Sequence, residues 1–188
     1  MVESTNFRVH RYHFIRESYV FRDMFSPPVP AGDSVEGQST SNPIILEQIQ
    51  AEDFRSLLWF FYDSHYDHDP AEADRFGTWK GILRLSRLWG IKRLFKLASE
   101  KLKALELSDP FIKIGIALEY KFSPEWALPE YVAICRRPEA LKMSEIAQLS
   151  QEMIVKVAAL RERPQRGSLS SSAVCDMLMK PLAWDDCL

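Results

Sequence analysis

The stretch from residue 7 to residue 25, FRVHRYHFIRESYVFRDMF, is the part of the sequence on which the expected fold depends. Phe7–Val9 is predicted to form a short strand that leads into a helix from about Tyr12 to Phe25. Along that helix, apolar side chains recur at i, i+7 and i+11 and therefore share one face: Phe14, Phe21 and Phe25. Charged side chains lie largely around the rest of the helix, which is typical of a helix with one buried face. The stretch carries no catalytic pattern.

The composition limits the classes of function. The chain has 188 residues and a net charge of −2, from 24 basic and 26 acidic residues, so it has no bulk attraction for nucleic acid or anionic membrane. No apolar run approaches the roughly 20 residues needed to span a bilayer. The three cysteines, Cys135, Cys175 and Cys187, are widely spaced. This spacing favours reduced thiols and an intracellular location, in the cytoplasm or the nucleus.

The chain up to about residue 105 combines short apolar runs with helical patterns. A second strand is predicted at Pro43–Leu46, an apolar run that follows a loop of small polar residues. The next helix is predicted from apolar residues at i, i+3, i+4 and i+7: Phe54, Leu57, Leu58 and Phe61. Two further helices, about Gly77–Trp89 and from Ile91 onward, follow an acidic loop. We therefore expect an α+β fold, a small β-sheet packed with a cluster of α-helices and followed by an α-helical extension.

These elements, in this order, resemble the BTB/POZ family. The opening resembles it in Phe7-Arg8-Val9-His10-Arg11, followed by Ser18 and by Phe21-Arg22-Asp23-Met24-Phe25. Ile44-Ile45-Leu46 resembles the middle strand of the family. The run from Asp53 to Tyr62 resembles its next helix, and Leu83 to Leu102 its closing helix hairpin. The resemblance assigns residues 1–106 to a BTB/POZ-like domain whose first strand is truncated.

The remainder of the chain divides into an extension and a tail, and a helix of the extension is predicted to start at Ser108-Asp109-Pro110, a cap followed by proline in the first turn. Residues 107–164 resemble the short helical extension of many BTB-domain proteins of mushroom-forming fungi (basidiomycetes). The motifs that carry this resemblance are Pro124-Glu125-Trp126 and the stretch from Tyr131 to Pro138. Residues 165–188 form a Ser-rich tail, for which we expect disorder, with a short docking piece at Met177–Trp184.

The resemblance implies a non-enzymatic protein–protein interaction module that self-associates or binds a partner protein. In the family, the first helix meets its twin across a two-fold axis, which implies an interaction site at Ile15, Tyr19 and Val20, apolar residues off the buried stripe. Loss of most of the first strand removes strand exchange, so a weak homodimer is expected. We expect no cofactor, no bound metal, no nucleic-acid partner and no membrane partner.

Five residues are expected to be structural parts of the family motif: His10, Ser18, Phe21, Met24 and Phe25. His10 stands alone, without a cysteine, serine or paired carboxylate at a useful spacing. We therefore interpret it as a partly buried imidazole whose hydrogen bonds tie the strand end to the helix start, and not as a ligand or a base.

Two alternative functions stay open. The first is a substrate adaptor for a cullin-based ubiquitin ligase, a role of some family members, although the hydrophobic–x–Glu element that they often carry is absent after Tyr62. The weaker one is a metal-dependent hydrolase, because one loop gathers imidazole and carboxylate ligands: Asp63, His65, Asp67, His68 and Asp69. The preferred interpretation of that loop is a solvated acidic loop.

Two other features have ordinary interpretations. Basic residues on the third and fourth predicted helices form a solvated face or a patch that complements an acidic partner: Lys80, Arg84, Arg87, Lys92, Arg93 and Lys96. Cys135 lies in an apolar helical pattern and is expected to be a buried small hydrophobe, not a nucleophile.

Overall fold

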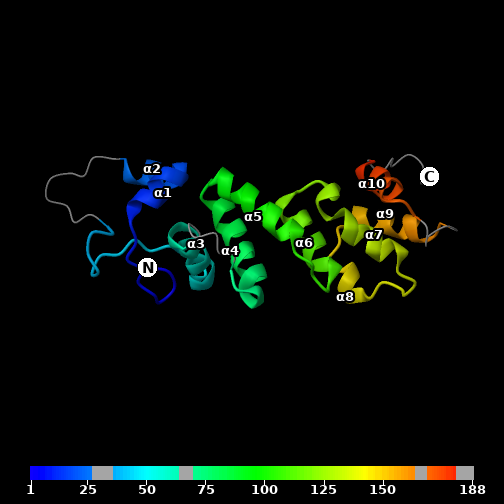
Figure 1. Cartoon of the computed structure of the whole chain (residues 1–188), viewed down its shortest axis with the longest axis horizontal. Helices are drawn as coiled ribbons and strands as arrows, with labels where there is room; N and C mark the ends of the chain where they lie inside the picture. Colours follow the sequence, from blue (N-terminus) through cyan, green and yellow to red (C-terminus); the bar gives the residue numbers. More distant parts are fainter. Residues whose placement is uncertain (27–35, 64–69, 164–168, 181–188) are drawn as a thin grey trace. The chain divides into compact units, whose positions relative to one another are not determined.

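The computed structural model describes residues 1–26, 36–63, 70–163 and 169–180. The chain forms two compact units, Met1–Leu105 and Glu106–Leu188 (Figure 1). The helices of the first unit are α1 (Arg11–Glu17), α2 (Tyr19–Phe25), α3 (Ala51–Tyr62), the 3-10 helix η2 (Glu72–Asp74), α4 (Arg75–Leu88) and α5 (Lys92–Ala104). Those of the second unit are α6 (Pro110–Tyr120), the 3-10 helix η3 (Pro124–Ala127), α7 (Leu128–Arg136), α8 (Met143–Ile146), α9 (Gln151–Arg161) and α10 (Ser171–Met179).

The predicted α+β class is wrong for the described part of the chain, which is helical and contains no strand or sheet. Its strand-like pairings are isolated bridges between Val2 and Thr5, Val2 and Leu46, and Ser39 and Asn42. Neither predicted strand forms: Phe7–Val9 makes no bridge to a described residue, and Pro43–Leu46 contributes Leu46 alone.

The main-chain hydrogen bonds explain why no ladder develops. Val2 and Thr5 exchange bonds of 3.0 and 2.9 Å across a tight turn in which Glu3 has a φ of 49°. The Leu46 N–H donates to the Met1 carbonyl at 2.9 Å, but this pairing does not extend along the chain. The Phe7 ring packs on Phe54 with a centroid distance of 4.9 Å. Side-chain packing, not a hydrogen-bonded ladder, therefore holds the segment that was predicted as the first strand.

The single helix predicted from Tyr12 to Phe25 is two helices, because the chain leaves the helical conformation at Ser18. Ser18 has φ −119° and ψ 123°, and its hydroxyl oxygen accepts a bond from the Phe21 N–H at 3.2 Å. The same residue is therefore the end of α1 and the N-cap of α2. The apolar spacing does not reveal this break, because Phe14 and Phe21 stay on the buried side of both helices.

Aromatic side chains form the centre of the first unit. The Phe14 ring lies 5.0 Å from Phe21, 5.3 Å from Phe61 and 6.0 Å from Phe54 between centroids. Trp89 closes the cluster at 4.9 Å from Phe21. These rings come from α1, α2, α3 and the end of α4, so their burial fastens the N-terminal helices to the helix hairpin.

Helices α3, α4 and α5 pack in sequence, and glycines allow their close approaches. At Gly81 an added Cβ would lie 3.0 Å from the Asp53 Cα, so α4 can lie this near α3 only without a side chain there. Arg84 forms an ion pair of 3.1 Å with Asp53 beside this contact. Gly90, with a φ of +64°, makes the turn between α4 and α5.

The second unit begins with the predicted start signal at Asp109, whose carboxylate caps α6 by accepting a bond from the Phe111 N–H at 2.9 Å. Its core consists of side chains from α6, α7 and α9 that are almost fully buried: Phe111, Ile114, Tyr131, Ile134, Cys135, Val157 and Leu160. Lys113 is buried as well, in an ion pair of 2.8 Å with Glu130 that joins α6 to α7.

Helix α10 lies within the tail for which we expected disorder. Ser170 caps it by accepting a bond from the Ala173 N–H at 3.1 Å. Val174 and Leu178 are buried on its inner side, and α10 packs against η3, α7 and α9. Burial of a few apolar side chains thus orders a segment whose Ser-rich composition suggested disorder. The expected docking piece at Met177–Trp184 overlaps the end of this helix, and its residues from 181 onward lie outside the described ranges.

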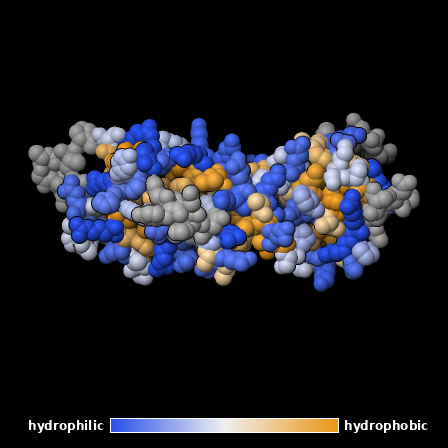
Figure 2. All heavy atoms as spheres, in the orientation of Figure 1, coloured by the Kyte–Doolittle hydropathy of each residue, from blue (hydrophilic) through white to orange (hydrophobic). Residues whose placement is uncertain are grey.

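Polar and charged side chains cover much of each unit in the view of Figure 2, and within each unit some apolar side chains reach the surface. None of the helices in the described ranges is long and apolar enough to cross a membrane.

Candidate protein-interaction surface

The outer face of α1 and α2 exposes several large apolar side chains. Tyr12 is 63% exposed, Tyr19 55% and Met24 42%. Ile15 and Val20 are half-buried beside them. The structure therefore places the three predicted interaction residues on these two helices, with Tyr19 as the most exposed of the three. We call the set Tyr12, Ile15, Tyr19, Val20 and Met24 the outer face.

Sequence reasoning did not select Tyr12 and Met24 for this face. Met24 was expected to be a structural part of the family motif, but its side chain is 42% exposed. Tyr12 lies at the first turn of α1, where its ring has the Arg16 guanidinium 5.2 Å from its centroid. An i, i+4 pairing of tyrosine and arginine is a signal in the sequence that indicates an exposed helix position.

Tyr19 is held in place by the turn between α4 and α5. A Cβ added at Gly90 would lie 1.9 Å from the Tyr19 Cε1 atom, so the ring rests directly on the glycine main chain. Nearby, the Ser18 hydroxyl donates to the Trp89 carbonyl at 2.6 Å. These two contacts hold the start of α2 against the end of α4 and the turn that follows it.

His10 does not have the role that we predicted for its side chain. The residue is exposed, and its main-chain N–H, not its imidazole, donates to the Tyr62 hydroxyl at 2.9 Å. The His10 and Tyr62 rings are 6.4 Å apart between centroids. The tie between the N-terminal segment and α3 is therefore a main-chain bond to a tyrosine at the end of α3.

Three of the other structural motif residues lie inward, whereas Met24 is 42% exposed. Ser18 is fully buried, Phe21 is 6% exposed, and Phe25 is half-buried. The Phe25 ring is stacked on Phe21 at 6.1 Å, and the Arg11 guanidinium lies 4.6 Å from its centroid. Phe25 thus closes the aromatic cluster on one side and borders a cavity on the other.

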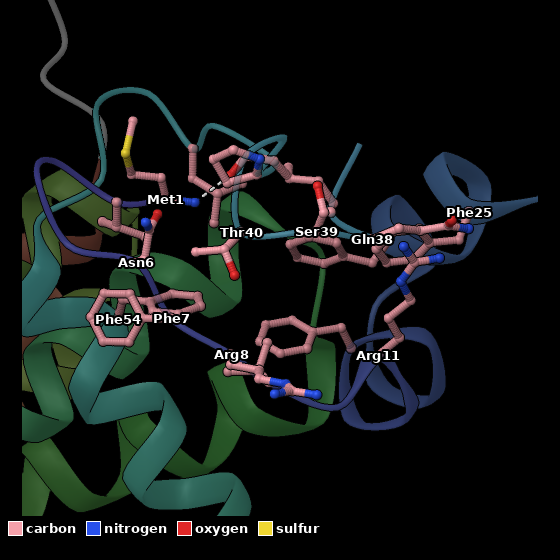
Figure 3. Close-up of a pocket in the computed structure, with 18 residues that line it drawn as sticks. Met1, Asn6, Phe7, Arg8, Arg11, Phe25, Gln38, Ser39, Thr40 and Phe54 are labelled. Atoms are coloured by element: carbon pink, nitrogen blue, oxygen red, sulfur yellow. Dashed lines mark hydrogen bonds between the residues drawn. The ribbon is translucent and has the colours of Figure 1, made fainter. Parts of the chain in front are cut away.

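That cavity, of about 520 Å³, lies between the N-terminal segment, α1, α2 and the chain from Gly37 to Leu46 (Figure 3). Phe7 and Phe54 lie together at one end of it, and Arg11 reaches toward Phe25 at the other. Its lining combines apolar and polar groups in about equal measure, and the polar side chains include Asn6, Arg8, Gln38, Ser39 and Thr40. No aspartate or glutamate is among the described residues that line it. Sequence reasoning missed this cavity, because it depends on the absence of the predicted sheet.

Residues with catalytic or ligand chemistry do not converge in the described ranges. No group of three or more histidine, cysteine, aspartate or glutamate side chains there is arranged to hold a metal ion. The His/Asp loop lies outside those ranges except for Asp63, which is exposed. Cys135 is fully buried, as predicted, and this burial raises the pKa of its thiol to about 11, which keeps it in the unreactive protonated form at neutral pH.

The basic residues of the helix hairpin are on its surface. Lys80, Arg84 and Arg87 lie at i, i+4 and i+7 on α4 and are exposed. Arg84 is engaged with Asp53, and Lys96 of α5 lies 3.9 Å from Glu100. The helix hairpin thus carries an exposed basic face, part of which is engaged in ion pairs within the unit.

The first unit matches a known family of protein domains. A family model described as BTB/POZ domain matches residues 1–106. No curated protein gives a significant match to the chain. Such domains are generally non-enzymatic modules for protein–protein interaction and oligomerisation. Because the match covers more than half of the sequence, the chain belongs to the BTB/POZ domain family.

Proposed function

We propose that the chain is a protein-interaction module that self-associates through the outer face. The observation that carries this proposal is the exposure of Tyr12, Tyr19 and Met24 on two consecutive helices. Tyrosine and methionine are enriched in protein interfaces, and aromatic side chains supply much of the binding energy there.

The contact is a two-fold dimer in this proposal. In such an interface each residue of the patch is used twice, so a few apolar side chains suffice for association. No strand pairing contributes, because the described part of the first unit contains no strand. We therefore expect a reversible dimer whose population depends on concentration, not an obligate one.

Light scattering across a concentration series tests the proposal. The mass is expected to rise toward that of a dimer for the wild type and to stay at that of a monomer in Ile15→Glu. Ile45→Glu is the matched control, because Ile45 is 60% exposed and lies outside the outer face. Circular dichroism verifies that both variants fold. A constant monomer mass for the wild type at high concentration refutes the dimer, and equal effects of both variants refute the role of this face.

The second unit is, in the same proposal, the helical extension of the kind found in BTB-domain proteins of mushroom-forming fungi. Its motif residue Trp126 is 8% exposed and Tyr131 is 1% exposed, so these residues are core positions of that unit. We do not propose an adaptor role on a cullin scaffold. Residues 64–69, which follow Tyr62-Asp63 at the end of α3, lie outside the described ranges, and no described residue favours that role.

A further inference from the structure

The corner between α4 and α5 gathers basic side chains around one exposed leucine. We call this set the basic corner: Arg87, Leu88, Lys92, Arg93 and Lys96. We propose that the basic corner binds an acidic segment of a partner protein, with an apolar side chain of that segment against Leu88. This inference goes beyond the self-association proposed above, because none of these residues belongs to the outer face.

The turn between the two helices brings the residues of the corner together. Two of them end α4 and two begin α5, and the short turn through Gly90 separates these pairs. The Ile91 N–H donates to the Ser86 carbonyl at 2.8 Å, which folds the start of α5 back against the last turn of α4. Lys96 follows one helical turn after Lys92, on the same face of α5. All five residues of the corner are exposed, so a partner can reach them.

Charge is unevenly distributed within the first unit. The stretch Arg75–Ala104, which contains α4 and α5, has nine lysine and arginine residues and one acidic residue, Glu100. Residues 1–74 have five basic and 13 acidic residues. The helix hairpin is therefore a positive region within a unit whose charges nearly cancel. Such a region favours a segment that carries carboxylates.

The charges of the corner are weakly neutralised within the unit. The side chains of Lys92 and Arg93 form no ion pair or hydrogen bond with any residue that the structure describes. The Lys96 ammonium lies 3.9 Å from Glu100, in a pair that is exposed to solvent and therefore weak. Carboxylates of a bound segment can supply the counterions that Lys92 and Arg93 lack.

The position of these charges in α5 is unfavourable for the protein alone. Unpaired main-chain N–H groups make the start of a helix positive, so acidic residues are favoured there and basic residues at the opposite end. Helix α5 has the reverse arrangement. Lys92 and Arg93 lie in its first turn, no acidic residue does, and Ile91 provides no side-chain cap. An acidic partner relieves this repulsion, so the two side chains favour binding and not folding.

A protein segment fits the corner better than a nucleic acid does. Helices α4 and α5, both fully described, carry no exposed aromatic side chain on which a base can stack. The acidic excess of residues 1–74 repels a long polyanion that extends beyond the corner. Leu88 is 56% exposed and offers an apolar contact that a leucine among acidic residues can cover.

A labelled peptide tests the proposal on the full chain. The probe is an acetylated, amidated peptide with two glutamates on either side of a leucine, followed by fluorescence anisotropy. We expect saturable binding that weakens severalfold when the ionic strength rises from about 0.01 M to about 0.15 M, because the Debye length falls from about 30 Å to about 8 Å. A peptide with glutamines in place of the glutamates is expected not to bind, and one with serine in place of the leucine is expected to bind more weakly.

Two double variants locate the site. Lys92→Gln/Arg93→Gln is expected to weaken peptide binding about tenfold or more, because it removes the two unpaired charges. Arg8→Gln/Lys180→Gln, which removes two exposed positive charges elsewhere, is expected to leave binding unchanged. The Lys92→Gln/Arg93→Gln variant is also expected to unfold at the temperature of the wild type or above it, since these charges do not stabilise the start of α5.

The two proposals fail separately. Ile15→Glu is expected to keep peptide binding even where it abolishes the dimer, and Lys92→Gln/Arg93→Gln is expected to keep the dimer. Light scattering and anisotropy on the same variants therefore show which of the two surfaces is wrongly assigned.

Four results overturn the inference. One is the absence of saturable binding, and another is an equal loss of binding in both double variants, which would reduce the effect to general attraction. A third is a lowered thermal midpoint of Lys92→Gln/Arg93→Gln, which would give these side chains a structural role. The fourth is tighter binding of a single-stranded oligonucleotide with the same net charge as the peptide, which would assign the basic corner to nucleic acid.

Discussion

Ser18 and Gly90 show how single residues set the position of the outer face. Ser18 has an extended main chain between two helices, caps the second of them, and donates its hydroxyl to the Trp89 carbonyl inside the core. Gly90 supplies the left-handed turn on which the Tyr19 ring rests. Both residues act through shape and hydrogen bonding, and both link the N-terminal helices to the helix hairpin.

Ser18→Ala is expected to destabilise the first unit by about 1–3 kcal/mol, because the change removes a helix cap and leaves a buried carbonyl without its donor. Urea unfolding followed by circular dichroism measures the difference. Ser26→Ala is the control, since Ser26 is exposed and its hydroxyl donates to the Arg22 carbonyl of α2. Equal stability of the Ser18→Ala variant and the wild type would contradict the central role of Ser18.

Gly90→Ala is expected to destabilise the first unit by at least about 1–2 kcal/mol, because alanine is strained at the positive φ of this position. The clash of the new Cβ with the Tyr19 ring adds a further cost. The combined variant Gly90→Ala/Tyr19→Ala separates the two costs. If the ring clash contributes, the double variant loses less stability than the sum of the single variants, as a double-mutant cycle of urea midpoints would show. Additive losses would mean that Tyr19 moves aside freely.

Helices with local signals were predictable from sequence, whereas the strands were not. The apolar spacing from Phe54 to Phe61 predicted α3, and Asp109 before a proline predicted the start of α6. A strand at Phe7–Val9 depends on a partner from elsewhere in the chain, and the described residues supply only single bridges. The sequence singled out Ile15, Tyr19 and Val20 as a candidate interaction site, and this stays a prediction. The cavity was missed, because it arises where the sheet was expected.

An ion pair joins the short helix α8 to Arg137, the residue at the end of α7. Glu145 accepts two bonds from Arg137, of 2.9 and 2.7 Å, and one from the Lys142 N–H. The bond from Arg137, with that from Lys142, lowers the pKa of Glu145 from 4.5 to about 2. A carboxyl with a lowered pKa in the folded state stabilises the fold above its unfolded pKa, and this contribution is lost as the pH falls through the folded value.

Glu145→Gln is therefore expected to lower the thermal midpoint at pH 7, with a difference from the wild type that shrinks between about pH 4.5 and pH 2. Thermal unfolding across that pH range measures it. Glu162→Gln, at an exposed glutamate at the end of α9 in the same unit, is the control. A difference that stays constant with pH would show that the ion pair contributes through packing and not through charge.

Across the whole molecule, each of the two units has its own buried core, and we expect each to unfold with its own transition. Ile82 is fully buried in the first unit and Ile134 is 1% exposed in the second. Truncation of either to alanine is expected to cost its own unit about 2–5 kcal/mol and to leave the other transition in place. Calorimetry distinguishes this from a single transition that moves equally in both variants.

The reactivity of the Lys156 amine depends on whether α10 is docked, because Lys156 is buried and bonds to this helix. Its ammonium lies 2.5 Å from Glu152 and 2.7 Å from the Leu178 carbonyl, and the residue is 4% exposed. An acylating reagent reacts only with a free, accessible amine, so Lys156 is expected to react slowly while α10 is in place and readily once α10 is released. Val174→Asp, which places a charge in the contact of α10, is expected to speed this reaction, with Lys142, an exposed lysine of the same unit, as the internal reference. Mass spectrometry of the acylated peptides then measures the acylation rate of the Lys156 side-chain nitrogen, and this rate reports whether α10 is docked.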